Sequence, residues 1–391
     1  MPLTFAEAFW WLGVAWLIYV YAGYPLLLGL IGLVARVRTR AREGRWPSVS
    51  VLIAARNEEK DIGWKIRETL AWEYPADRLE VLVASDASDD RTDEIVRGFQ
   101  DPRVHLVRME KRGGKVRALN RLAELARGEI LFFTDANASI PAGCLRLMVR
   151  HFADPRVGCV TGITRGWDPK SAGAVSQGAG LYFRYESLIA SLESRLGSVL
   201  ACDGAVHCLR RELFAPLQPE LANDLEAPLR VARSGRLTLF EPGAYALEKE
   251  TEAPAEEFAR RRRIAAQGAL AMWRFRGALA GLRGWQFVSH KFLRWLTPLP
   301  LAAVLASSAA LAHRPFYALA LAAQGIFYAA ALAALLQARQ GKHVSRALAV
   351  PFYVLLGATA TLVGVVEAAL GRSFDVWEVA TLSRGAQNAG S

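Results

Sequence analysis

Cysteine is scarce in this chain, and the spacing of the few cysteines argues against a zinc site. The four residues are Cys144, Cys159, Cys202 and Cys208 among 391. None of the intervals between them has the short Cys-x-x-Cys form of zinc ligands. They fall in a segment that we expect to be cytoplasmic. We therefore interpret them as reduced thiols of a protein core.

The sequence also lacks an internal repeat, a low-complexity tract and a Walker phosphate loop. Residues 111–115 form a basic, glycine-containing turn, but the glycine spacing and the Lys-Ser/Thr pair of a Walker loop are missing. The formal net charge is +11. No nucleic-acid recognition motif accompanies the basic residues, which cluster beside apolar stretches. These absences argue against nucleic acid as a partner and favour anionic membrane lipid.

Charged side chains are absent from residues 8–34, which can cross a ~30 Å hydrocarbon core as a helix. No small-residue cleavage site follows, so a signal peptide is excluded. Three further apolar stretches lie at residues 295–312, 316–336 and 347–366, and the first is short enough to be re-entrant. Arginines at positions 36, 38, 40, 42 and 45 follow the first stretch. The positive-inside rule therefore places the next segment in the cytoplasm of a multi-pass protein.

Between the apolar stretches, strand and helix patterns alternate. We predict strands at 49–54, 79–84, 104–107 and 130–134, and helices at 57–72, 90–99 and 115–126. This alternation indicates an α/β domain with parallel βαβ units and helices on both faces. Arginine-rich amphipathic helices, suited to a membrane surface, should follow. We expect four parts: 1–46 (first span and basic segment), 47–254 (α/β domain), 255–290 (interfacial helices) and 291–391 (spans and tail).

Polar residues follow the predicted strands, where open α/β sheets bind ligands. Asp86 lies in the turn after the second strand, and Asp135 and Asn137 follow the fourth. Hard oxygen atoms there can hold a divalent cation. Asp224 can act as a general base, although a helix N-cap is the preferred explanation from the local residues alone. Each signal also has a purely structural explanation. The acidic and basic motifs can be solvated turns, and the arginine run can be a lipid-facing helix face. His207 is a metal ligand or a structural histidine.

The order of these motifs resembles that of the family 2 glycosyltransferases with the GT-A fold. The likeness covers nearly the whole chain and is greatest to the membrane-embedded synthases of cellulose, chitin oligosaccharide, hyaluronan and poly-N-acetylglucosamine. It rests on Ala55-Arg56-Asn57-Glu58, Ser85-Asp86-Ala87-Ser88-Asp89-Asp90, Gly113-Gly114-Lys115 with Asn120, Asp135-Ala136-Asn137, Gly204-Ala205, Asp224, Arg260-x-x-Arg263 and, more loosely, Trp377-x-x-x-Thr381-x-x-Arg384.

The resemblance implies a Rossmann-like GT-A domain inserted between membrane helices at the bacterial plasma membrane. It implies inverting transfer of a sugar from a nucleotide sugar, with UDP as the nucleotide, to a growing polysaccharide. The catalytic residue would be Asp224, and Gly204 and Ala205 would bind the acceptor. Mg²⁺ or Mn²⁺ would be held by Asp135 and Asn137. The donor-binding set would be Ala55, Asn57, Glu58, Asp86, Lys115, Asn120, Asp135, Arg260 and Arg263.

Three positions depart from the family pattern. Asn137 replaces the second Asp of the metal motif, Asn223 replaces the Glu of a Glu-Asp pair, and Ile264 replaces a Trp. Two other hypotheses therefore stay open. One is transfer of a single sugar to a lipid, such as polyprenyl phosphate, diacylglycerol or a ceramide-like acceptor. The other is a catalytically silent scaffold or translocation subunit. Four or fewer spans make a narrow conduit for a polymer, so an oligomer or export partners would accompany polymer synthesis.

Overall fold

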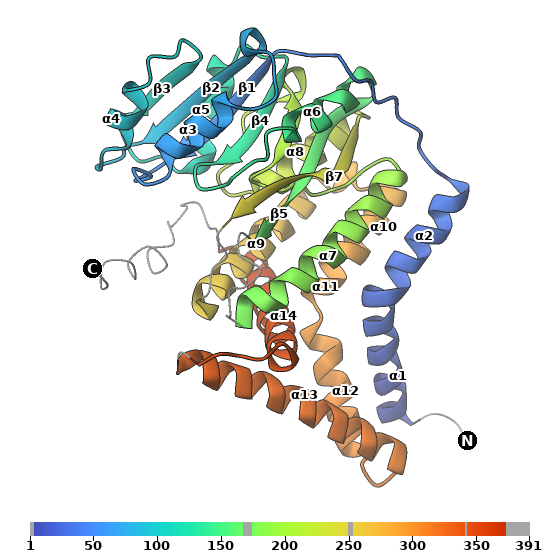
Figure 1. Ribbon diagram of the computed structural model, residues 1–391. Helices are drawn as coiled ribbons and strands as arrows, with labels where there is room; N and C mark the ends of the chain where they lie inside the picture. Colours follow the sequence, from blue (N-terminus) through green and yellow to red (C-terminus); the bar gives the residue numbers. More distant parts are fainter. Residues whose placement is uncertain (1–3, 167–173, 249–252, 341, 373–391) are drawn as a thin grey trace.

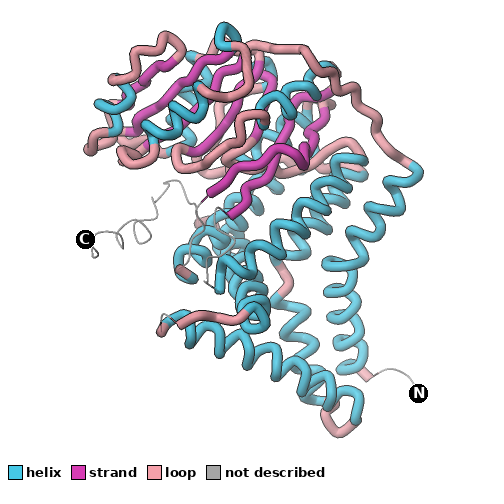
Figure 2. Tube along the Cα trace, viewed as in Figure 1, coloured by secondary structure: helices cyan, strands magenta, loops and turns pink. Residues whose placement is uncertain are grey.

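A mixed sheet lies at one end of the molecule and a group of long apolar helices at the other (Figure 1). The computed structural model describes residues 4–166, 174–248, 253–340 and 342–372. The C-terminal Trp377–Arg384 motif lies outside these residues. Figure 2 shows the strands gathered in the upper part of the molecule, whereas the lower part consists of helices. The two regions correspond to the α/β domain and the apolar stretches of the sequence.

The sheet has seven strands in the order β3-β2-β1-β4-β6-β5-β7. Their bounds are β1 Val49–Ala55, β2 Leu79–Asp86, β3 Val104–Met109, β4 Ile130–Asp135, β5 Val157–Gly166, β6 His207–Arg210 and β7 Leu237–Glu248. Strands β1 to β4 pair in parallel, as the alternation of elements predicts. Strand β6 runs antiparallel to β4 and β5. The parallel register pairs Ala54 with Asp135, so the acidic ends of β2 and β4 lie on either side of β1 at one edge of the sheet.

Helices cover both faces of the sheet because side chains alternate along each strand. Val51 and Ile53 of β1 pack with one apolar cluster, which includes Ile62 and Ile66 of α3. Leu52 belongs to the other cluster, which includes residues of α5. The domain helices are α3 Ile62–Leu70, α4 Thr92–Arg97, α5 Lys115–Leu125 and α6 Cys144–Val149, with short 3₁₀ turns η2 Ala76–Arg78, η3 Arg150–Ala153 and η4 Arg211–Leu213. Strand β1 is buried on both faces, as expected for a parallel sheet covered by helices.

Within the described ranges, three helical segments are long and apolar enough to span a membrane, and a bent pair of helices makes up to four. The first is Phe5–Val34, made of α1 Phe5–Ile18, the π-helical η1 Tyr19–Gly23 and α2 Tyr24–Val34. The others are α13 Pro315–Arg339 and α14 Arg346–Ala369. The pair Leu282–Trp295 and Pro298–Ala310 is bent by 56°. It contains α10 Leu282–Phe287, the π-helical η6 Val288–Phe292, α11 Leu293–Trp295 and α12 Pro298–Ala310.

Helices α7 Ala174–Arg195 and α9 Pro254–Arg274 lie between the sheet and the apolar helices (Figure 1). Helix α8 Asn223–Arg233 contacts β5, β7 and α9, and the 3₁₀ turn η5 Arg276–Ala278 follows α9. Helix α9 packs closely on α14. A Cβ atom added at Gly364 would lie 2.1 Å from the carbonyl oxygen of Arg262, so only glycine permits this approach. Residues of α8, α9, α10 and α11 share one apolar cluster that includes Leu225 and Trp295. The domain is thereby joined to the apolar helices by packing and not only by the chain.

Candidate active site

A cavity of about 380 Å³ lies between the sheet edge and helices α8 and α9. Its charged lining residues include Lys115, Asp135, Asp203, Asp224 and Glu248. They come from the start of α5, the end of β4, the segment before β6, the start of α8 and the end of β7. Segments far apart in the sequence therefore supply one polar site.

Asp135 ends β4 and forms an ion pair with Lys115 at the start of α5. Burial lowers the pKa of Lys115, but the neighbouring Asp135 carboxylate outweighs this effect and leaves the pKa above its ordinary value. Lys65 contacts the turn after Asp135, and its ammonium donates to the carbonyl oxygen of Ala138 at 2.5 Å. Burial lowers the pKa of Lys65 to about 8. This hydrogen bond ties the turn after β4 to helix α3.

Asp86 at the end of β2 binds the glycine turn that leads into α5. Its two carboxylate oxygens accept hydrogen bonds from the backbone N–H groups of Gly113 and Gly114, at 2.6 and 2.8 Å. Gly114 has a φ of +83°, in the left-handed region that glycine adopts without strain. Both glycines line the cavity, together with Lys115. Asp86 therefore positions the turn that presents this lysine.

Two further carboxylates reach the same cavity. Asp203 accepts hydrogen bonds from the backbone N–H and the hydroxyl of Thr164, at 2.6 and 2.7 Å, and burial raises the pKa of Asp203. Burial, followed by the charges of Asp135 and Asp203, raises the pKa of Glu248 to about 7. His207, in contrast, stacks on Phe133, and burial lowers its pKa to about 4. The structure therefore gives His207 a packing role and leaves carboxylates as the acidic lining.

Asp224 is the second residue of α8, and its backbone carbonyl accepts from the N–H of Cys202 at 2.7 Å. The helix cap is Ala222, so Asp224 does not cap α8. Burial raises the pKa of Asp224, and the Lys115 charge partly opposes that rise. Beside it, the Nδ2 atom of Asn223 is buried with no hydrogen-bond partner among the described residues. A half-buried carboxylate and an amide donor thus face the cavity together.

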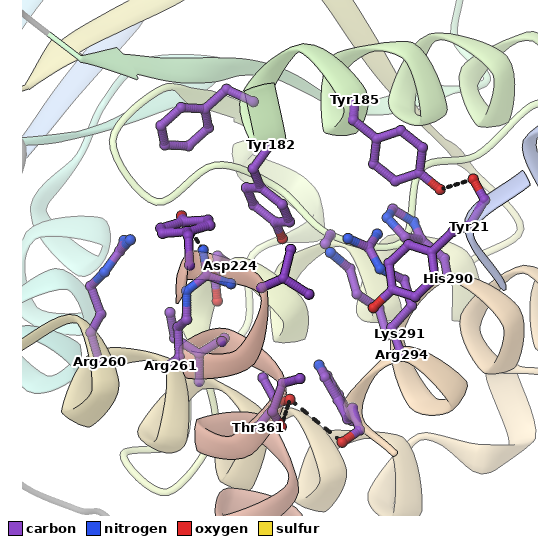
Figure 3. A pocket seen from close by; sticks show the side chains of 18 of the residues that line it. Tyr21, Tyr182, Tyr185, Asp224, Arg260, Arg261, His290, Lys291, Arg294 and Thr361 are labelled. Carbon is purple, nitrogen blue, oxygen red and sulfur yellow. Dashed lines mark hydrogen bonds between the residues drawn. The ribbon is translucent and has the colours of Figure 1, made fainter. Parts of the chain in front are cut away.

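A second cavity of about 430 Å³ adjoins the first on the side of the apolar helices (Figure 3). Asp224, Arg260 and Ile264 line both cavities. Arg260 is held by Glu257, which accepts from its Nε atom at 2.9 Å. Asp224 therefore lies where two separate spaces meet, a position suited to chemistry between two substrates.

The structure brings together seven of the residues singled out in the sequence. Lys115, Asp135, Gly204, Ala205, Asp224, Arg260 and Arg263 all line the first cavity. Six others are outside its lining, namely Ala55, Asn57, Glu58, Asp86, Asn120 and Asn137. The site therefore divides into residues that face the cavity and residues that support its walls.

The second group has identifiable contacts. Asn57 accepts from the backbone N–H of Asp89 at 3.1 Å, and its amide thus joins the ends of β1 and β2. Asn120 makes two hydrogen bonds with the backbone of Leu217, at 2.9 and 2.8 Å, and so holds a loop near the cavity. Ala55 and Glu58 are buried, whereas Asn137 is exposed. Asn137 is thus not brought to the cavity with Asp135.

Sequence reasoning missed Asp203, Glu248, Lys291 and Arg294. Asp203 directly precedes the Gly204-Ala205 pair, which was a usable signal. Lys291 and Arg294 stand in a largely apolar segment, and charged residues in such segments commonly have a function. Glu248 had no local signal. It reaches the site because the backbone of Leu247 pairs with Ser139, in the turn after β4, at 2.9 and 2.7 Å.

The model of the family described as glycosyl transferase family 2 matches residues 50–212. Residues 50–212 are a glycosyltransferase family 2 domain. A solved mannosyltransferase from Pyrobaculum calidifontis, in complex with GDP-Man and Mn²⁺, is similar to 91% of this chain and 99% of its own, with 25% identity and a TM-score of 0.67. The family 2 domain thus has a GT-A fold, and the likeness to that structure extends beyond residues 50–212.

Curated relatives match parts of the chain. The beta-monoglucosyldiacylglycerol synthase of Synechocystis sp. is 37% identical over 119 residues, which are 29% of this chain and 25% of the relative. The probable glycosyltransferase YdaM of Bacillus subtilis is 28% identical over 224 residues, 53% of this chain and 51% of the relative. The matches therefore span a quarter to a half of these relatives.

The lining of the first cavity fits a divalent cation. Asp135 and Glu248 both line this cavity and supply hard carboxylate oxygens. Within the described ranges, no group of three His, Cys, Asp or Glu side chains is arranged to hold a metal. Mg²⁺ and similar ions commonly take one or two carboxylates together with substrate phosphates. The residues therefore fit an ion that is coordinated partly by the protein and partly by a diphosphate.

Proposed function

We propose that this chain is an inverting glycosyltransferase that uses a nucleotide diphosphate sugar. The observation that carries the proposal is the position of Asp224 between two cavities within a family 2 enzyme fold. Asp224 takes the proton of an acceptor hydroxyl, and the oxygen attacks the anomeric carbon as the bond to the diphosphate breaks. Burial raises the pKa of Asp224, which makes it a stronger base than an exposed carboxylate. The product has a β linkage if the donor is α-linked.

The first cavity is the proposed donor site. The ammonium of Lys115, presented by the glycine turn, faces the diphosphate, and Arg260 and Arg263 approach it from α9. Asp135 and Glu248 would hold Mg²⁺ or Mn²⁺, which supplies charge neutralisation to the leaving diphosphate. The Pyrobaculum mannosyltransferase, solved with GDP-Man and Mn²⁺, supports a nucleotide sugar and a metal. A UDP-sugar is the donor implied by the sequence.

The second cavity is the proposed acceptor site, and its walls favour a lipid over a polysaccharide. Val350, Val354 and Ala358 of the candidate span α14 form part of its lining. The Synechocystis relative is named for a diacylglycerol product, which supports a lipid acceptor. A growing polysaccharide, which the sequence resemblance implies, would need a conduit that continues past this space. We place the reaction at the cytoplasmic face of the plasma membrane on the arginines that follow the first span.

Incubation with labelled nucleotide sugars and membrane lipids tests the proposal. The purified chain in lipid nanodiscs would receive UDP- and GDP-sugars one at a time, with Mn²⁺ present or chelated. A single labelled glycolipid that requires the metal is the expected product. A ladder of high-mass products would identify a polysaccharide synthase. Absence of both transfer and donor hydrolysis with every donor would leave a silent scaffold as the explanation and overturn the proposal.

A further inference from the structure

The second cavity has a cationic lining that a neutral lipid does not require. Four of its described lining residues are cations, namely Arg260, Arg261, Lys291 and Arg294, while Asp224 is the one carboxylate. They come from α9 on one side and from η6 and α11 on the other, and Figure 3 shows them around the same space. An anionic group is a stronger hydrogen-bond partner for these cations than a hydroxyl group.

Each pair of cations shares one carboxylate. Glu186 accepts from Arg294 at 2.5 Å and lies 3.5 Å from Lys291. Glu257 accepts from Arg261 at 2.6 Å and from Arg260 at 2.9 Å. In the α9 group, two positive charges face one carboxylate. In the other group, His290 lies 3.2 Å from Glu186 and 2.8 Å from a second carboxylate, Glu193, so two carboxylates offset Lys291 and Arg294. The cations of both groups line one partly apolar space, where their N–H groups can bind an anion.

Two arginines are held in fixed positions by aromatic rings. The guanidinium of Arg261 lies 4.8 Å from the ring centre of Tyr182 and 4.6 Å from that of Tyr353. The guanidinium of Arg294 lies 5.6 Å from the same Tyr182 ring and 5.4 Å from that of Tyr185. Tyr182 therefore stands between the two arginines, as Figure 3 shows. Guanidinium groups that are positioned in advance lose little freedom when they bind a phosphate.

The apolar helices reach the same space. Gly357 of α14 lies against Arg261, since a Cβ atom added there would be 3.0 Å from its Nη1 atom. The π-helical segments η1 and η6 meet nearby, where the hydroxyls of Tyr19 and Ser289 are 2.7 Å apart. π-Helical turns are often found at functional sites. The cavity thus has charged, aromatic and membrane-helix walls, which match the headgroup and chain regions of a lipid.

Resting on the proposed function, we infer that the acceptor is an anionic lipid with a free hydroxyl, whose phosphate lies among Arg261, Lys291 and Arg294 while its hydroxyl reaches Asp224. The hydroxyl proton passes to Asp224, the lipid oxygen bonds to the anomeric carbon, and the nucleotide diphosphate departs with the electron pair of the broken bond. The anionic group takes no part in bond formation and serves to position the hydroxyl.

Matched lipids test this inference. Phosphatidylcholine nanodiscs would carry the enzyme with phosphatidylglycerol, diacylglycerol or phosphatidic acid of the same acyl chains, and glycerol phosphate would be added in solution as a chain-free control. Phosphatidylglycerol should be glycosylated with a KM at least about tenfold below that of diacylglycerol, or about 1.4 kcal/mol. Phosphatidic acid, which has the phosphate but no carbon-bound hydroxyl, should inhibit competitively. Glycerol phosphate should be a poor substrate.

Substitutions of single residues test which side chains bind the phosphate of the lipid. Lys291→Gln and Arg294→Gln should each raise the KM for phosphatidylglycerol about tenfold, and Arg294→Lys should restore part of it. Arg274→Gln removes an exposed α9 arginine that pairs with Glu220 at 3.0 Å, and should change nothing. Stabilisation by nucleotide diphosphate would show that each variant is folded. Equal use of the neutral and anionic lipids, or an unchanged KM in both glutamine variants, would overturn the inference while leaving the proposed function intact. If the wild-type protein turned over no nucleotide-sugar donor at all, the proposed function itself would be overturned.

Discussion

Replacement of Asp224 by Asn tests the central residue of the proposed mechanism. The change keeps the size of the side chain and removes its ability to accept a proton. General base catalysis contributes about 10²–10⁴-fold to a rate, so we expect kcat to fall about 10³-fold, or ~4 kcal/mol. The donor contacts from Lys115, Arg260 and Arg263 remain. Nucleotide-sugar binding, measured by thermal shift or calorimetry, should therefore be unchanged.

The pH dependence gives a second readout. Because burial raises the pKa of Asp224, the ionised base accumulates only as the pH rises through that elevated value. The wild-type rate of transfer should thus increase with pH along this limb and then level off, and Asp224→Asn should lose the limb. The raised pKa also means that the ionised carboxylate destabilises the fold above that pKa. The neutral Asn variant should consequently melt at the same temperature as the wild type or higher.

Glu220→Gln is the matched control. Glu220 lies just before α8, is partly exposed, and pairs with Arg274 outside both cavities. Its loss should leave kcat and the pH profile unaltered. Wild-type turnover in Asp224→Asn, with the rising limb preserved, would refute the assignment of the base. An equal loss of activity in both variants would mean that the defect is structural.

Three further predictions concern the donor site and the packing beneath it. Lys115→Met should weaken binding of a nucleotide diphosphate by about 10–100-fold in calorimetry, because a charge-assisted contact of roughly 1.5–3 kcal/mol is lost; unaltered affinity would place the diphosphate elsewhere. Asp135→Asn should abolish the rise in melting temperature caused by Mn²⁺ with nucleotide, while the exposed Asn137→Ala should preserve it, and the reverse result would restore Asn137 as the ligand. Gly364→Ala should destabilise the protein by about 1–3 kcal/mol through overpacking against α9 and lower its melting temperature, whereas Gly325→Ala, which has open space around it, should not.

The first half of the domain follows from local pattern. Apolar strands separated by amphipathic helices predict the parallel units β1 to β4, because a strand covered on both faces must be apolar along its length. Asp86 and Asp135 were placed at the sheet edge for the same reason. Strands β5, β6 and β7 were not predicted. Their positions depend on pairing with strands far away in the chain, and no local pattern records that pairing.

The apolar segments could also be identified from the sequence. Residues 8–34 are uncharged and long, and hydropathy alone identifies such segments. Only the structure shows that the helices Leu282–Trp295 and Pro298–Ala310 meet at a bend of 56°, and that Lys291 and Arg294 line the second cavity. In sequence, these two residues resemble basic residues at the end of a span. Their role depends on which helices pack around them.

The sequence by itself determined the elements of the domain, the apolar spans and the candidate base, because each depends on the composition or spacing of neighbouring residues. The tertiary structure alone decided how the site is divided. It placed Glu248 and Asp135 in the lining of one cavity, left Asn137 at the surface, and set Asp224 between that cavity, the proposed donor site, and a second cavity next to α14. The physical reason is that such a site is made by backbone pairing and helix packing between distant segments, and these contacts exist only in the folded chain.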